Sequence, residues 1–126
     1  MAHYIDGFSF PIPSDSLNDY MRLAEAAAEI WKEHGALEYH EYVGDDMNLK
    51  GTRSFVDLLT AGEDETIVFG WVVFDSRETR DRANEKVAAD PRMARLVEST
   101  NSNFDAGRMA YGGFRSLVRC SDTEAV

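Results

Sequence analysis

The chain has 126 residues, of which 44% are apolar and 29% charged, and its formal net charge is −10 at pH 7. That size suits a single domain, which we place over residues 1–120, followed by a polar tail at 121–126. The acidic excess argues against a nucleic-acid partner, because phosphate binding needs clustered lysine and arginine. No apolar run approaches the roughly 18 residues of a membrane span. We therefore expect a cytoplasmic protein without a membrane partner, and the single cysteine, Cys120, cannot form an internal disulfide.

The first third of the chain predicts a strand, a long helix and a second strand. Residues 4–10 are rich in strand-forming side chains and end at two prolines. Apolar residues then recur at steps of three and four over residues 17–34, which indicates an amphipathic helix that ends at a glycine. Residues 37–43 alternate as a strand does, and this alternation places Glu41 on the same face as Tyr39.

The middle of the chain predicts a loop and a buried strand. The loop occupies residues 44–66, and within it residues 55–59 are expected to form a short extra strand. The next segment, residues 67–74, is an apolar run without polar alternation. A strand of that kind must be covered on both faces.

The last third predicts two helices and a closing strand. Asp75 or Ser76 can cap a helix whose charged face includes Arg80. Asp90 followed by Pro91 indicates that a short helix restarts there. The final strand is expected over residues 109–118.

The resulting order, β-α-β-β-α-β, is that of a ferredoxin-like α+β fold with both main helices on one face of an antiparallel sheet. The other face would be bare, although strands there also carry apolar side chains such as Ile5 and Phe114. An exposed apolar patch of that size is unusual for a monomer, so we expect a homodimer whose sheets pack face to face. The alternative is that residues 44–66 fold over the open face.

Several segments spread over nearly the whole chain carry a resemblance to a known family. They are Tyr4-Ile5-Asp6-Gly7-Phe8, Glu41 with Asp45-Asp46, Val68-Phe69-Gly70-Trp71, Arg80-Asp81 with Asn84, Asp90-Pro91-Arg92-Met93, and Met109 with Tyr111-Gly112-Gly113-Phe114. In combination they resemble the YbaA-like family of small bacterial proteins of unknown function. The resemblance implies a dimeric α+β barrel, a superfamily that also contains cofactor-free monooxygenases, haem-degrading proteins and small isomerases. It implies no settled activity.

Two carboxylates are the candidate catalytic residues. Glu41 lies on an otherwise apolar strand face, where partial desolvation would raise its pKa toward the range of a general acid or base. Asp6 occupies a similar place on the first strand. The alternative is that each carboxylate pairs with an arginine, which would be a structural role. The candidate arginines are Arg92, Arg108 and Arg115.

A ligand pocket between helix and sheet is a further hypothesis. Its candidate lining residues are Trp31, Tyr39, Phe69 and Trp71, with Arg92 as a polar partner. The same aromatic residues could instead be plain core.

No cofactor or metal is expected, because the acidic residues near Glu41 lack the spacing of a calcium loop. Three functions remain open: binding of a small apolar or aromatic molecule, a cofactor-independent monooxygenase-like or isomerase-like enzyme that uses Glu41 or Asp6 for proton transfer, and a structural or protein-interaction module.

Overall fold

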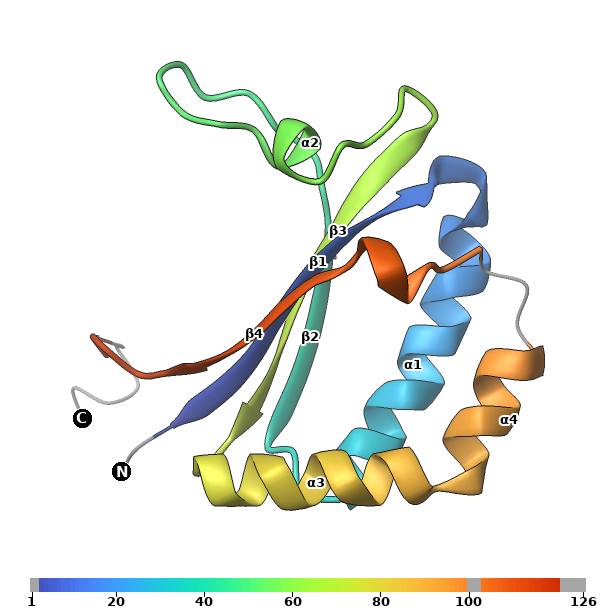
Figure 1. The fold of residues 1–126 in the computed structure, drawn as a ribbon, viewed down its shortest axis with the longest axis vertical. Helices are drawn as coiled ribbons and strands as arrows, with labels where there is room; N and C mark the ends of the chain where they lie inside the picture. The colour runs from blue at the N-terminus through green and yellow to red at the C-terminus, as the bar shows by residue number, and fades with distance from the viewer. Residues whose placement is uncertain (1–2, 100–102, 121–126) are drawn as a thin grey trace.

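The computed structural model describes residues 3–99 and 103–120. A four-stranded antiparallel sheet in the order β2-β3-β1-β4 packs its three longer helices against one face (Figure 1). This confirms the ferredoxin-like α+β prediction. The predicted polar tail at 121–126 lies outside the described residues. Within the described ranges, no helix is long and apolar enough to cross a membrane.

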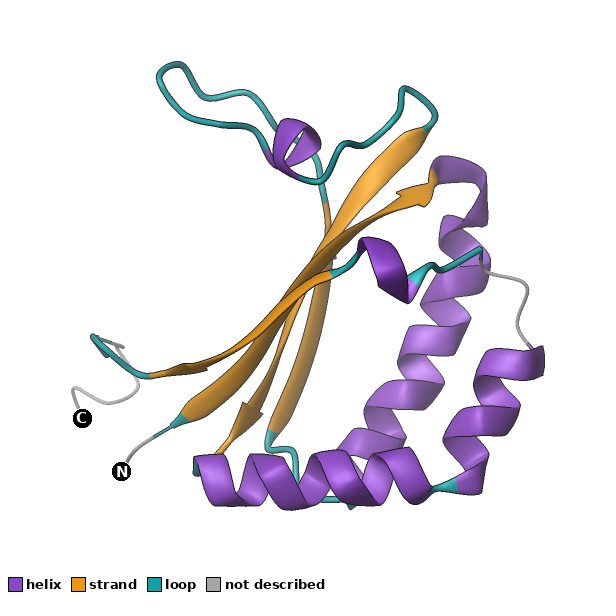
Figure 2. Ribbon diagram, in the orientation of Figure 1, coloured by secondary structure: helices purple, strands orange, loops and turns teal. Residues whose placement is uncertain are grey.

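Figure 2 shows where the strands and helices lie in the molecule. The strands are β1 (Tyr4–Pro13), β2 (Glu38–Val43), β3 (Glu65–Phe74) and β4 (Ala110–Arg115). The helices are α1 (Leu17–Glu33), α2 (Phe55–Leu58), α3 (Arg77–Ala89) and α4 (Pro91–Ser99), with 3-10 turns η1 (Ser14–Ser16) and η2 (Ala106–Arg108).

The loop between β2 and β3 differs from the prediction. Residues 55–59 do not form a strand, because the short helix α2 occupies this segment. The Ser54 hydroxyl accepts a hydrogen bond from the Val56 amide at 3.1 Å, which caps the helix. So short an apolar run has no periodicity that separates strand from helix. The last strand is also shorter than predicted and ends at Arg115.

The core lies between the helices and the face of the sheet that carries alternate residues of β1 and β3. Phe10 and Val68 form one buried cluster with residues of α1, while Phe74 forms a second with Ala83 of α3. Gly70 stands between them, opposite Phe8 on one side and Glu41 on the other. A methyl group there would lie 2.5 Å from the His40 carbonyl oxygen and 2.6 Å from the Phe8 ring. Glycine at this point lets the Phe8 ring lie across the sheet.

The opposite face of the sheet is covered at one end only. The α2 segment sits at that end (Figure 1), where the Phe55 ring contacts the Phe69 ring with centroids 5.7 Å apart. Even so, Phe69 remains 43% exposed, and Phe114 on β4 is 57% exposed. The loop therefore shields part of the apolar face, and most of the aromatic surface that motivated the dimer prediction remains open.

Candidate functional site

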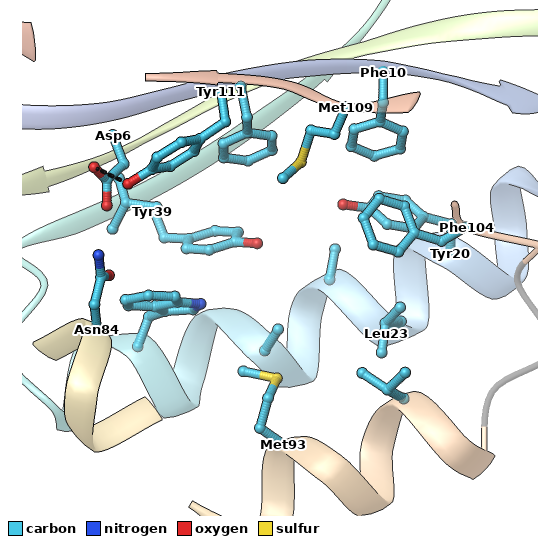
Figure 3. A pocket seen from close by; sticks show the side chains of 16 residues that line it. Asp6, Phe10, Tyr20, Leu23, Tyr39, Asn84, Met93, Phe104, Met109 and Tyr111 are labelled. Carbon is cyan, nitrogen blue, oxygen red and sulfur yellow. Dashed lines mark hydrogen bonds between the residues drawn. The ribbon is translucent and has the colours of Figure 1, made fainter. Parts of the chain in front are cut away.

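A cavity of about 350 Å³ lies between the sheet and helices α1, α3 and α4. Its walls are mostly apolar and include Phe10 from β1, Leu23 from α1 and Met93 from α4 (Figure 3). Trp31 and Tyr39 line it, as the sequence predicted for a ligand pocket.

Phe69 and Trp71 were also predicted to line this pocket, and this prediction is wrong. Successive residues of a strand point to opposite faces of the sheet, and in β3 the buried Val68 and Val72 take the helix side. Trp71 therefore lies on the open face, where its ring contacts His40, with centroids 5.3 Å apart. A run that is apolar on both faces gives no sign of which face meets the helices.

Arg92 also lies away from the cavity, which corrects its predicted place in the pocket. It is the second residue of α4, and its guanidinium pairs with Asp90 at 2.8 Å and with Glu33 at the end of α1 at 2.6 Å. These ion pairs join the end of α1 to the start of α4. Arg92 therefore links the end of α1 to the start of α4 and does not line the cavity.

Glu41 is held by two tyrosines that line the cavity. The Tyr39 hydroxyl donates to one carboxylate oxygen at 2.7 Å, and the Tyr20 hydroxyl donates to the other. In Figure 3 the hydroxyl groups of Tyr20 and Tyr39 point toward each other across the cavity wall. Glu41 itself is on the edge strand β2. Its hydrogen bonds thus come from phenols and not from an arginine.

The surroundings of Glu41 make its carboxylate harder to ionise. Burial raises the pKa of Glu41, and the hydrogen bonds from the tyrosines offset only part of that rise. Burial and the neighbouring carboxylate also raise the pKa of Tyr20 and of Tyr39, so both hydroxyls keep their protons. The apolar strand face around Glu41 predicted a raised pKa, and burial in the structure shifts the pKa in that direction.

Asp6 pairs with an arginine, as the structural alternative proposed. The partner is Arg80, which was not among the candidate arginines. Arg80 donates to the Asp6 carboxylate at 2.8 Å and to the Tyr111 hydroxyl at 2.9 Å. Asp6 is 3% exposed and Arg80 9% exposed, so this is a buried ion pair. The guanidinium also lies over the ring of Tyr4, 4.8 Å from its centroid.

The sequence assigned Arg80 to the charged face of its helix, but the structure buries it. The buried residues of α3 are Arg80, Ala83 and Val87. Their spacing of three and four is the signal that could have identified Arg80 as an inward-facing residue. Its positive charge concealed that pattern.

Asn84 follows Arg80 by one helical turn and lines the cavity. Its side-chain oxygen is buried and has no hydrogen-bond partner among the residues that the structure describes. An unsatisfied buried polar group costs about 1–3 kcal/mol. Figure 3 shows Asn84 at the same end of the cavity as Asp6 and Tyr111. Beyond the resemblance that includes it, no residue pattern singled out Asn84 as a polar group of the pocket.

The chain was then compared with known proteins. Residues 3–106 match a family described as a protein of unknown function, DUF1428. The chain belongs to this family. Among DUF1428 relatives, the uncharacterised protein YbaA of Escherichia coli K12 and that of Shigella flexneri are each 40% identical over 115 residues, covering 91% of this chain and 97% of theirs. The predicted YbaA-like resemblance is confirmed.

Solved structures share the fold of this DUF1428 chain at low sequence identity. A nipsnap family protein of unknown function from Agrobacterium tumefaciens has a TM-score of 0.58 and 14% identity, covering 95% of this chain and 92% of that chain. The ActVA-Orf6 monooxygenase of Streptomyces coelicolor, in complex with nanaomycin D, has a TM-score of 0.56 and 17% identity, with the same coverage. At these identities the likeness shows the fold alone.

Proposed function

We propose that this DUF1428 protein binds a small apolar or aromatic molecule in the cavity between the sheet and the helices. The cavity itself carries the proposal, because about 350 Å³ of space with apolar walls and a few convergent polar groups is the usual form of a small-molecule site. Protein interiors are close-packed, so an unfilled space of this volume is unusual in a core that has only a structural role. The ActVA-Orf6 monooxygenase, which shares the fold, was solved in complex with nanaomycin D, and this organic ligand supports the proposal.

Filling the cavity should abolish binding. Ala24 of α1 lines the cavity, and we expect Ala24→Phe to occupy the space that a bound ring would take. With 2-naphthol as the probe, titration calorimetry should show wild-type binding and at least a tenfold loss in Ala24→Phe. Ala26→Phe, on the exposed side of the same helix, serves as the matched control and should bind like the wild type. Equal binding by all three proteins would refute the cavity as the site.

Proton transfer is the second candidate function, and the raised pKa of Glu41 is the observation that favours it. A ligand in the cavity would contact the tyrosine hydroxyls. A proton that leaves the ligand could bind the Tyr39 oxygen as the Tyr39 proton passes to the Glu41 carboxylate that already accepts its hydrogen bond, so that Tyr39 stays neutral. This would suit a cofactor-independent monooxygenase-like or isomerase-like reaction. Asp6 is less suited to such a step, because its ion pair with Arg80 already uses the carboxylate. A structural module without chemistry is the remaining alternative.

We also propose that two copies pack through the open face of the sheet, as the sequence predicted, and that the protein is cytoplasmic. The exposed Phe69 and Phe114 lie on this face, which the α2 segment covers at one end only. Sedimentation velocity should give twice the chain mass for the wild type. Phe69→Asp should shift the protein to the monomer, whereas Met21→Asp, at an exposed position of α1, should leave the dimer intact. A monomeric wild type would rule out this arrangement.

A further inference from the structure

We infer that Asn84 accepts a hydrogen bond from the bound molecule, so that the cavity selects hydroxylated aromatic molecules such as neutral phenols. The inference deepens the proposed ligand binding and rests on it. It starts from the cavity-lining residue Asn84, whose side-chain oxygen is buried and has no hydrogen-bond partner among the described residues.

The hydrogen bonds around Tyr111 determine which end of the Asn84 amide faces the cavity. The Tyr111 hydroxyl gives its only proton to Asp6 at 2.7 Å and accepts a hydrogen bond from Arg80 at 2.9 Å. In Figure 3 the amide nitrogen of Asn84 points toward Asp6 and Tyr111, and Asn84 lowers the pKa of Tyr111, which is the effect of a donor. The amide nitrogen therefore faces Tyr111, and the oxygen is left over.

The phenolic protons of the cavity are already used within the protein. Tyr111 donates to Asp6, and Tyr20 and Tyr39 both donate to Glu41. The hydroxyls of Tyr20 and Tyr39 can still accept hydrogen bonds from a ligand, as can the oxygen of Asn84. The polar atoms presented by these residues are thus acceptors, which favours a ligand that brings its own donor.

The charges at this end of the cavity also favour a neutral ligand. Arg80 neutralises Asp6 through a contact of 2.8 Å, and the described residues that line the cavity include no lysine or arginine to attract an anionic ligand. The apolar walls would also make an anion costly to desolvate. A flat ring with one neutral hydroxyl satisfies the unpartnered oxygen and keeps the rest of its surface against apolar side chains.

A pair of probes that differ only in the donor tests the inference. 2-Naphthol carries a hydroxyl, and 2-methoxynaphthalene carries the same ring system without a donor. Titration calorimetry should show about tenfold tighter binding of 2-naphthol to the wild type. In Asn84→Leu this preference should fall to about one, even where both affinities change. Asn18→Leu, at an exposed position of α1, is the matched control and should keep the wild-type ratio.

The possible outcomes separate this inference from the proposed function. If the wild type binds both probes with equal affinity, or if Asn84→Leu keeps the preference, the role of Asn84 is refuted while ligand binding stands. If the wild type binds neither probe, the proposed function fails and the inference fails with it. Should Asn84→Leu not fold, as judged by circular dichroism, Asn84→Ser withdraws the oxygen from the cavity with a smaller change, and the same ratio decides.

Discussion

Replacing Arg80 with leucine should lower the free energy of unfolding by about 3–5 kcal/mol. The substitution leaves the Asp6 carboxylate, which is 3% exposed, without the guanidinium that contacts it at 2.8 Å. Tyr111 loses a hydrogen bond at the same time. A buried charge without a partner is among the largest costs that a single substitution can impose. Urea denaturation followed by circular dichroism measures the change.

Arg77→Leu is the matched control for this experiment. Arg77 lies on the same helix, but its side chain is 71% exposed and its ion pair with Asp81 spans 3.8 Å. Exposed pairs contribute little, so the control should change stability by less than about 1 kcal/mol. Equal losses in both variants would contradict a special role for the buried pair.

Glu41→Gln should leave the protein folded and remove any proton-transfer activity. Glutamine has nearly the same shape, and its amide can still form hydrogen bonds with Tyr20 and Tyr39. It cannot exchange a proton near neutral pH, so an activity that depends on Glu41 should fall about 10²–10⁴-fold. Binding of 2-naphthol should survive. Glu25→Gln, at an exposed position of α1, is the control.

Glu41→Gln should also change how stability depends on pH, and this can be measured without a substrate. Because folding raises the pKa of Glu41, the favourable contribution of its protonated form is complete below the pKa of the unfolded chain, about 4.3. It is lost as the pH rises through the folded pKa. Wild-type stability should therefore fall relative to Glu41→Gln as the pH rises from about 4 to 7. Parallel pH profiles of the wild type and Glu41→Gln would contradict a raised pKa.

Local patterns along the chain were enough to predict most of the fold. The steps of three and four in α1 and the Asp90-Pro91 helix start are properties of neighbouring residues, so they survive without knowledge of the rest of the molecule. Where local signals are weak, prediction failed. The α2 segment is too short to show a period, and the apolar β3 shows the same character on both faces.

For the candidate site, the chemistry of one residue was predictable and its partners were not. Alternation along β2 placed Glu41 on an apolar face, and that alone indicated a raised pKa. Its hydrogen bonds to Tyr20 and Tyr39 depend on how α1 lies across the sheet. An arginine partner for Asp6 was one of the two alternatives, but the sequence did not identify Arg80. The two residues are 74 positions apart, and the local pattern around each residue does not depend on the other.

The residue order alone therefore determined the α+β class, the order of the main strands and helices along the chain, and the unusual setting of Glu41, because periodicity and alternation arise from the backbone geometry of each element. Only the tertiary structure decided which face of β3 meets the helices, which side chains surround the cavity, and that the Asn84 oxygen stays without a partner. Those features depend on the distances between elements that are remote in the chain, and no local pattern encodes them.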